Sequence, residues 1–154
     1  MTSTKPYTLH PNTYFGILLK TRFRKRGWLY IFLIAIGFAH LYWFFTNDSY
    51  GNLFWAFLCF VVPLFAITYL WRFSLSEVNK EFLSQKQLFF DSEKVKIVNT
   101  NGNEGLIPYD KFAFIKENPK YWLLYIDKTQ FFYIPKNIFN TAEDYSIFQN
   151  YLYQ

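Results

Sequence analysis

Two long apolar runs without a charged side chain dominate the first half of the sequence. They are WLYIFLIAIGFAHLYWFFT at residues 28–46 and LFWAFLCFVVPLFAITYLW at residues 53–71. Each has nineteen residues, and at about 1.5 Å per residue a helix of that length covers roughly 28 Å, about the thickness of a hydrocarbon core. Neither run carries the polar stripe that a surface helix needs. The sequence therefore predicts a two-helix transmembrane hairpin with residues 47–52 as its loop.

The flanking charges predict the orientation of this hairpin. Basic residues gather directly before the first run, and interfacial aromatic residues open it: Lys20, Arg22, Arg24, Lys25, Arg26, Trp28 and Tyr30. The loop has no Lys or Arg, whereas Arg72 follows the second run. By the positive-inside rule both termini lie in the cytoplasm, the loop lies outside, and the basic residues face anionic lipids of the inner leaflet. We expect a multi-pass protein of the bacterial inner membrane.

The same basic residues raise the question of nucleic-acid binding, since cations beside aromatic rings also bind phosphates and stack on bases. The excess charge, however, lies at one end of the chain. Residues 1–73 hold seven Lys or Arg and one acid, a net charge of +6, whereas residues 74–154 have a net charge of −1. No extended basic face remains for DNA or RNA, and we expect no nucleic-acid partner.

Residues 1–27 form a basic N-terminal segment, expected in the cytoplasm. From about Asn12 onward, apolar residues recur at helical spacing and predict an amphipathic helix. Such a helix can lie on the inner leaflet or pack on the cytoplasmic domain, and the sequence leaves both arrangements open.

After Arg72 the pattern becomes that of a small α+β domain. Residues 72–85 predict a linker helix, and short apolar or alternating runs then predict strands at 86–90, 94–99, 104–107, 112–117, 121–126 and 130–134. Turn residues such as Asn101-Gly102 separate the runs, which favours an antiparallel meander. Thr141 and Asp144 have the spacing of a capping box before a final helix. We expect residues 86–154 to form a curled antiparallel sheet closed by this C-terminal helix.

The last part of the chain is the segment FDSEKVKIVNTNGNEGLIPYDKFAFIKENPKYWLLYIDKTQFFYIPKNIFNTAEDYSIFQNYL. Its recognisable elements are the strand end Phe90-Asp91, the strand that leads into Pro108-Tyr109, the Ile115-Lys116-Glu117 strand, and YIPKNIF at residues 133–139. In the order of these elements the segment resembles the YcxB-like family of bacterial membrane proteins. The resemblance implies a C-terminal domain similar to bacterial pleckstrin-homology-like modules on a two-span anchor. It implies no activity and no catalytic residue.

The residues themselves offer no arrangement for catalysis. The sequence contains no Gly-rich phosphate loop, nucleophile elbow or HExxH motif, and residues 74–154 contain no His or Cys. Cys59, His10 and His40 lie far apart in the sequence, so they predict no metal site. We expect no catalytic, cofactor-binding or metal site and no cofactor.

Two polar residues have more than one interpretation. His40, inside the first run, is expected to be a neutral side chain that faces the partner helix or the interface, although ionisable groups in membranes are often functional. Lys136 of the YIPKNIF motif is a candidate contact for a lipid headgroup or a partner. The favoured interpretation of that motif is a structural corner, where Pro135 ends a strand.

These features favour a non-enzymatic inner-membrane protein whose cytoplasmic domain binds an unknown protein partner or membrane lipids. The alternative is an immunity or accessory protein that acts with a toxin or a transporter through its spans. A channel would need polar pore-lining residues, which both apolar runs lack. The sequence leaves open whether the chain forms a homo-oligomer.

Overall fold

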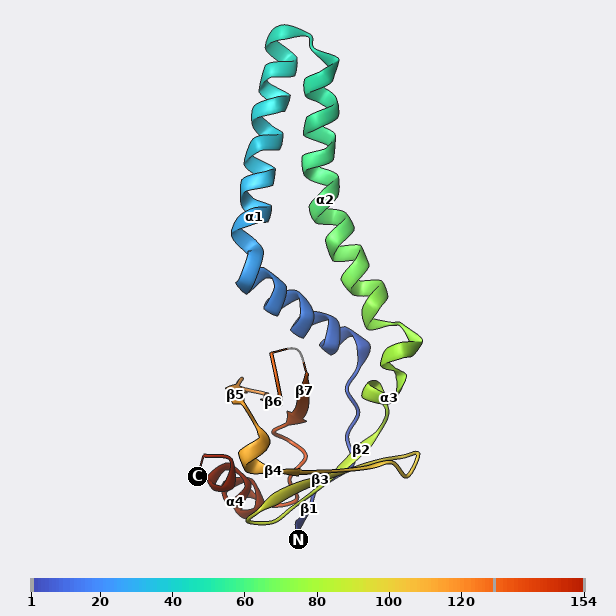
Figure 1. Cartoon of the computed structure of the whole chain (residues 1–154), viewed down its shortest axis with the longest axis vertical. Helices are drawn as coiled ribbons and strands as arrows, with labels where there is room; N and C mark the ends of the chain where they lie inside the picture. Colours follow the sequence, from blue (N-terminus) through green and yellow to red (C-terminus); the bar gives the residue numbers. More distant parts are fainter. Residues whose placement is uncertain (1, 129, 154) are drawn as a thin grey trace. The chain divides into compact units, whose positions relative to one another are not determined.

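The chain forms two compact units, and Figure 1 colours the chain along its sequence. We call Met1–Leu9 together with Glu81–Gln154 the sheet unit, and His10–Lys80 the hairpin unit. The computed structural model describes residues 2–128 and 130–153. Met1, Thr129 and Gln154 belong to the predicted N-terminal segment and the predicted domain, and they lie outside the described residues.

The hairpin unit consists mainly of α1 (Pro11–Asn47) and α2 (Tyr50–Ser74). α1 begins with a proline, which suits the first helical position because its fixed φ is already helical. It is one continuous helix and so joins the predicted amphipathic segment to the first predicted span. The connecting loop is shorter than the predicted 47–52, since only Asp48 and Ser49 separate the helices. Asp48 adopts a left-handed φ of 47°, which Asp tolerates better than most residues.

Glycine permits close contact between the two long helices. A Cβ atom on Gly37 would lie 3.0 Å from Cζ of Phe60 and 3.1 Å from Cβ of Cys59, closer than carbon atoms normally approach. Phe38 packs edge to face on Phe60, with 5.3 Å between the ring centroids. The side chains of α1 and α2 therefore interlock at this level.

The predicted linker helix, 72–85, is wrong as one element. Its first residues belong to α2, and two short helices follow, η1 (Glu77–Asn79) and α3 (Lys80–Leu83). The side chain of Asn79 folds back and donates to the carbonyl oxygen of Phe73 at 2.6 Å. The same carbonyl accepts from Ser76 N–H at 3.1 Å, and the two contacts together cap the end of α2.

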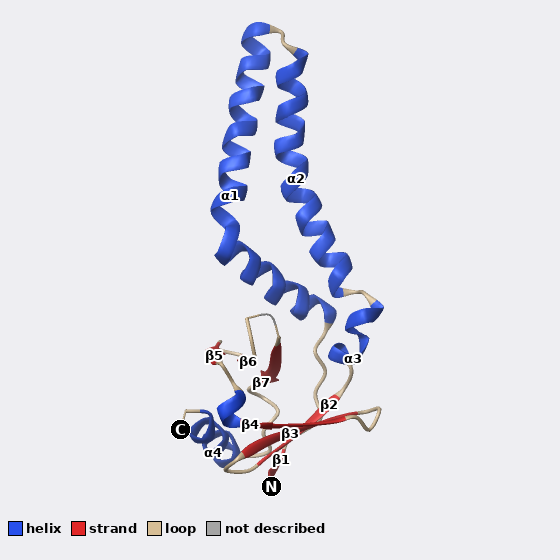
Figure 2. Ribbon diagram, viewed as in Figure 1, coloured by secondary structure: helices blue, strands red, loops and turns tan. Residues whose placement is uncertain are grey.

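The described residues of the sheet unit form a four-stranded and a three-stranded antiparallel sheet, coloured red in Figure 2. The strands of the first are, in order, β1 (Thr2–Ser3), β2 (Lys86–Phe90), β3 (Lys94–Asn99) and β4 (Glu104–Pro108). Those of the second are β5 (Phe114–Glu117), β6 (Tyr121–Tyr125) and β7 (Phe131–Pro135). The six predicted strands are thus present within two residues of their predicted ends. They do not form one continuous meander, because the 3-10 helix η2 (Tyr109–Lys111) separates β4 from β5.

The N-terminal residues complete the first sheet, which the sequence analysis did not predict. Thr2 pairs with Phe90 and Ser3 with Phe89, so β1 lies beside β2. The hairpin unit is therefore inserted between two neighbouring strands of the sheet unit. The predicted single segment 1–27 is divided between β1 and α1. The sequence did not indicate β1, because a strand of two residues is too short to show alternation.

Turn residues act as the sequence indicates. Oδ1 of Asp91 accepts from the backbone N–H groups of Glu93 at 3.0 Å and Lys94 at 3.1 Å, which closes the turn between β2 and β3. Gly102, in the turn between β3 and β4, has a φ of 78°, a conformation that glycine adopts without strain.

The helix α4 (Ala142–Leu152) covers an aromatic core. Both bonds of the predicted capping box are present: Asp144 N–H donates to Oγ1 of Thr141 at 3.0 Å, and Thr141 N–H donates to Oδ2 of Asp144 at 3.2 Å. The ring of Trp122, which is fully buried, lies 5.2 Å from that of Tyr145 and 5.7 Å from that of Phe148. The buried core consists of Tyr7, Leu88, Phe90, Val95, Ile97, Trp122, Leu124, Ile134, Ile138, Phe139, Phe148 and Leu152.

Candidate functional site

A cavity of about 160 Å³ lies in the sheet unit where the segment after β1 meets β2 and β3. Most of its lining is polar, with Pro6 and Val98 as the apolar members, and the polar residues are Gln85, Lys86, Gln87, Asn99 and Thr100. We call it the Lys86 cavity. Its position follows from the register of the sheet, in which Lys86 pairs with Asn99 and Gln87 with Val98.

Lys86 is the charged residue of this cavity and is partly desolvated. Its Nζ donates to the carbonyl oxygen of Phe82 at 2.8 Å and lies 4.8 Å from the centroid of the Phe82 ring. Burial lowers the pKa of Lys86 to about 8, and the negative charge of Glu81 offsets only part of this effect. The amine is thus a cation that has lost much of its water, and an acidic ligand would replace that water.

Hydrogen bonds hold the wall of the Lys86 cavity in place. Nε2 of Gln87 donates to the carbonyl oxygen of Thr4 at 2.9 Å, and the Thr100 hydroxyl donates to the carbonyl oxygen of Gln85 at 2.8 Å. The cavity therefore has a fixed polar wall, and Lys86, whose amine is partly desolvated, is one of its lining residues. This arrangement suits binding of a small anionic group, such as a carboxylate or a phosphate. The sequence analysis missed it, because a lysine at a strand end resembles an ordinary exposed lysine.

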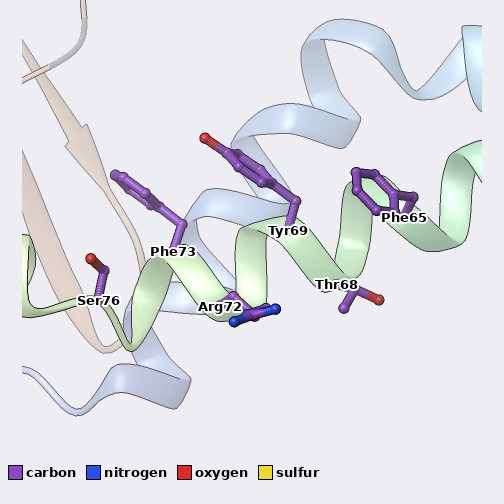
Figure 3. A pocket seen from close by; sticks show the side chains of 6 residues that line it. All are labelled: Phe65, Thr68, Tyr69, Arg72, Phe73 and Ser76. Carbon is purple, nitrogen blue, oxygen red and sulfur yellow. The ribbon is translucent and has the colours of Figure 1, made fainter.

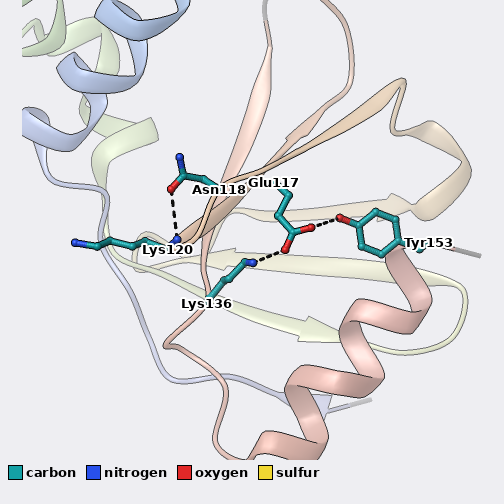
Figure 4. Close-up of polar contacts among 5 residues, drawn as sticks. All are labelled: Glu117, Asn118, Lys120, Lys136 and Tyr153. Carbon is teal, nitrogen blue, oxygen red and sulfur yellow. Dashed lines mark hydrogen bonds and ion pairs between the residues drawn. The ribbon is translucent and has the colours of Figure 1, made fainter.

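Lys136 lies instead in a closed corner of the sheet unit (Figure 4). Its Nζ donates to Oε1 of Glu117 and lies 4.8 Å from the centroid of the Trp122 ring. Oε2 of Glu117 accepts from the Tyr153 hydroxyl at 2.9 Å, so the corner ties β5 to the end of α4. The side chain of Lys136 is 17% exposed.

The charges of this corner stabilise one another. The bonds from Lys136 and Tyr153 hold the pKa of Glu117 below its usual value. Desolvation opposes the charged form of Lys136, but the bond and charge of Glu117 raise the pKa of the lysine overall. These contacts support the interpretation of YIPKNIF as a structural corner. The headgroup or partner contact at Lys136 stays a prediction.

The basic residues predicted to orient the chain lie on α1. Lys20, Arg22, Arg24, Lys25 and Arg26 are exposed. Nε of Arg22 donates to the hydroxyl of Tyr30 at 3.3 Å. Trp28 is 66% exposed, whereas Tyr30 is buried. The two aromatic residues therefore differ in environment, and their predicted interfacial role stays a prediction.

His40 faces the partner helix, as predicted. Its Nδ1 lies 3.1 Å from Oδ1 of Asn52 on α2, so a ring N–H donates to the amide oxygen. The ring also meets that of Trp43 edge to face at 5.7 Å. The imidazole thus bonds the two helices to each other. Among the described residues, no group of three His, Cys, Asp or Glu side chains is placed to hold a metal ion.

These features define a class of protein: a small antiparallel-sheet domain with a C-terminal helix, joined to two helices that are long and apolar enough to cross a membrane. Residues 90–152 match the model of the family described as YcxB-like protein, which confirms the resemblance seen in the sequence. The match begins at Phe90, so the hairpin unit and Lys86 lie outside it, whereas Val98, Asn99 and Thr100 of the Lys86 cavity lie within it. No curated protein and no solved structure matches the chain.

Proposed function

We propose that this chain is a non-enzymatic protein of the bacterial inner membrane. Its hairpin unit crosses the bilayer, and its sheet unit is a pleckstrin-homology-like module that binds a protein or a lipid headgroup at the cytoplasmic face. Four antiparallel strands, three further antiparallel strands and a final helix among the described residues support the pleckstrin-homology-like part of this proposal.

The exposure of the two long helices is the observation that carries the proposal. In their most apolar windows, only 11% of the α1 residues and 17% of the α2 residues are buried. Large apolar side chains such as Ile31, Phe45 and Phe65 are each more than 70% exposed. A core helix of a soluble protein would bury these side chains, and exposed apolar surface of this extent favours contact with lipid.

The chain connectivity supports the proposed orientation. Residues 2–9 and 81–153 belong to the same unit, so the chain has to return to the side from which α1 departs. Two crossings of the membrane return the chain to that side, whereas a single crossing would not. The basic residues of α1 and the loop without Lys or Arg then favour the cytoplasm for the sheet unit.

Membrane extraction and protease protection test this proposal. We expect the protein to stay in the membrane pellet after washing with alkaline carbonate or high salt. A tag at the C-terminus should survive protease added to intact spheroplasts and be cut only after lysis. Release by carbonate would disprove the spans, and cleavage of the tag in intact spheroplasts would disprove the orientation.

The Lys86 cavity is the proposed ligand site of the module, because Lys86, whose amine is desolvated, is one of the residues that line this polar, concave surface. We expect crosslinking and pull-down from native membranes to recover a ligand with wild-type protein and to lose it with Lys86→Gln. Lys80→Gln is the matched control, since the Lys80 side chain is 79% exposed and lies outside the cavity. Recovery of the same partner after deletion of the sheet unit would instead support the accessory function through the spans.

A further inference from the structure

A second cavity, of about 570 Å³, lies along one face of α2 (Figure 3). Its lining residues follow a four-residue spacing in two rows. Those of α2 lie on one side of the helix, because residues four apart do so, and Ser76 lies two residues beyond the end of α2 at Ser74. The aromatic row is Phe65, Tyr69 and Phe73, and the polar row is Thr68, Arg72 and Ser76. We call the space along these rows the α2 groove.

The aromatic row forms an apolar platform that is largely exposed. Phe65 is 71% exposed, Tyr69 62% and Phe73 37%. The rings of Tyr69 and Phe73 lie nearly parallel, with 17° between their planes and 6.5 Å between their centroids. Such a surface suits contact with a hydrocarbon chain.

Arg72 places a cation at one end of this platform. It is the one charged residue in the sequence of α2, and in the described part of the chain its guanidinium forms no ion pair. The carbonyl groups at the end of a helix carry partial negative charge and would repel an anion. Here the Arg72 carbonyl accepts from Leu75 N–H at 3.2 Å and the Phe73 carbonyl from Ser76 N–H at 3.1 Å, so both are occupied.

The length of the groove corresponds to one leaflet. From Phe65 to the end of α2 at Ser74 the helix rises roughly 14 Å, about half of a hydrocarbon core of ~30 Å. The groove is therefore apolar over the depth of one acyl layer and cationic at the level where phosphate groups begin.

We infer that the α2 groove binds one anionic glycerophospholipid of the inner leaflet, with its phosphate at Arg72 and Ser76 and an acyl chain beside Phe65 and Tyr69. A guanidinium binds phosphate through paired hydrogen bonds. Because Arg72 forms no ion pair with a carboxylate of the described residues, its charge favours a lipid of net negative charge over a zwitterionic one, which makes Arg72 the residue that selects the lipid. This inference rests on the proposed membrane insertion and names a lipid that the inserted helix would bind.

Lipid titration of the full-length protein in a mild detergent tests the inference. Native mass spectrometry would measure binding of phosphatidylglycerol and of phosphatidylcholine with the same acyl chains. We expect the wild type to prefer phosphatidylglycerol and Arg72→Gln to bind it about tenfold more weakly, which corresponds to ~1.4 kcal/mol. Lys80→Gln is the matched control, because it removes one positive charge from an exposed side chain of the same unit, outside the groove.

A second pair of variants tests the aromatic row. Tyr69→Leu should weaken binding of phosphatidylglycerol, whereas Trp71→Leu should not, since Trp71 is exposed on the same helix but lies outside the groove. If Arg72→Gln and Lys80→Gln lost the same affinity, general attraction between charges would explain the effect, and the inference would be overturned. Equal binding of the two lipids by the wild type would also overturn it.

The two proposals fail in different ways. Release of the wild type by alkaline carbonate would remove the membrane anchor and the lipid site together. If the wild type resists carbonate but Arg72→Gln binds phosphatidylglycerol as tightly as the wild type, the proposed membrane anchor stands and only the lipid site is rejected.

Discussion

Tyr7 and Lys86 exchange two backbone hydrogen bonds: the N–H of each donates to the carbonyl oxygen of the other at 2.8 Å. This bridge joins the two ends of the sheet unit, between which the hairpin unit is inserted. Insertions are tolerated where the flanking backbone stays paired, as it does here. The N-terminal residues therefore stabilise the sheet unit in addition to leading into α1.

The first prediction concerns this shared fold. A protein in which a linker of about eight Gly and Ser residues replaces the hairpin unit, between residues 1–9 and residues 81–154, should be soluble and fold cooperatively. We call it the joined sheet unit. Residues 81–154 alone should be less stable, because they lack β1 and the buried side chains of Tyr7 and Leu9. Urea unfolding followed by circular dichroism measures the difference, and equal stability of the two fragments would show that the N-terminal residues are not needed.

Thr4→Val tests the same pairing in the joined sheet unit. Thr4 is 2% exposed, and its hydroxyl accepts from Leu88 N–H at 3.2 Å. The variant leaves Leu88 N–H, which is buried, without this acceptor. We expect the free energy of unfolding to fall by about 1–2 kcal/mol.

A second prediction concerns the aromatic core under α4. Phe148 is fully buried, and its ring centroid lies 5.1 Å from that of Phe90 and 5.2 Å from that of Phe139. Phe148→Ala should lower the free energy of unfolding of the joined sheet unit by about 3–5 kcal/mol, because it leaves a cavity. Phe114→Ala is the matched control: Phe114 is 46% exposed, and its stacking on Tyr125 accounts for only about 0.5–1.5 kcal/mol. A similar loss of unfolding free energy in both variants would show that Phe148 is not part of the buried core.

Local signals allowed much of the fold to be predicted. Alternation in Lys94–Asn99, the turn at Gly102 and the capping box at Thr141 each depend on residues that are neighbours in the sequence. The positions of β2, β3 and α4 were therefore predicted correctly. The family resemblance was confirmed over residues 90–152, where these signals are densest.

What the sequence did not reveal depends on contacts between distant residues. The pairing of Thr4 with Leu88 joins positions 84 apart, and no neighbouring residue indicates it. The candidate site was missed for another reason: the amine of Lys86 contacts Phe82, only four residues earlier, and a lysine at a strand end gives no sign of this burial. Lys136, by contrast, was singled out from its motif, and its contacts with Glu117 and Trp122 agree with the structural interpretation given there.

A third prediction follows from the pKa of Glu117, which its bonds to Lys136 and Tyr153 hold below the usual value. A carboxylate with a lowered pKa stabilises the fold above its unfolded pKa, and this contribution is lost as the pH falls through the folded pKa. Glu117 is 43% exposed, so we expect Glu117→Gln to cost only about 0.5–1 kcal/mol at neutral pH.

The pH dependence distinguishes this effect from a general loss of packing. The unfolding free energies of wild type and Glu117→Gln should converge in acid, because the wild-type carboxyl is then also neutral. Glu93→Gln, which removes an exposed carboxylate elsewhere in the sheet unit, is the control. A difference that stays constant down to acid pH would contradict the role of the charge.

A fourth prediction concerns Lys86, whose pKa burial lowers to about 8. Competitive labelling of amines over a range of pH should give a midpoint near 8 for Lys86 in the folded protein and near ~10.4 in urea. The unfolded chain binds the extra proton between these values, so stability should rise with pH in this window, and Lys86→Met should remove the rise. A midpoint above 10 in the folded protein would contradict the desolvated environment and remove the main support for the Lys86 cavity.

The last prediction concerns the contact between α1 and α2 at Gly37. A Cβ atom on this residue would lie 3.1 Å from Cβ of Cys59, somewhat closer than the distance of about 3.5–4.5 Å that a disulfide requires. A small outward shift of the helices would bring the pair into range. Because Cys59 is the one cysteine of the sequence, Gly37→Cys in membranes treated with a mild oxidant should form an intramolecular disulfide, detected as a faster band on non-reducing gels. Ala39→Cys, whose side chain is exposed on the same helix, should stay reduced or form dimers between chains. Dimers from both variants, without the faster band, would show that α1 and α2 do not pack through Gly37 in the membrane.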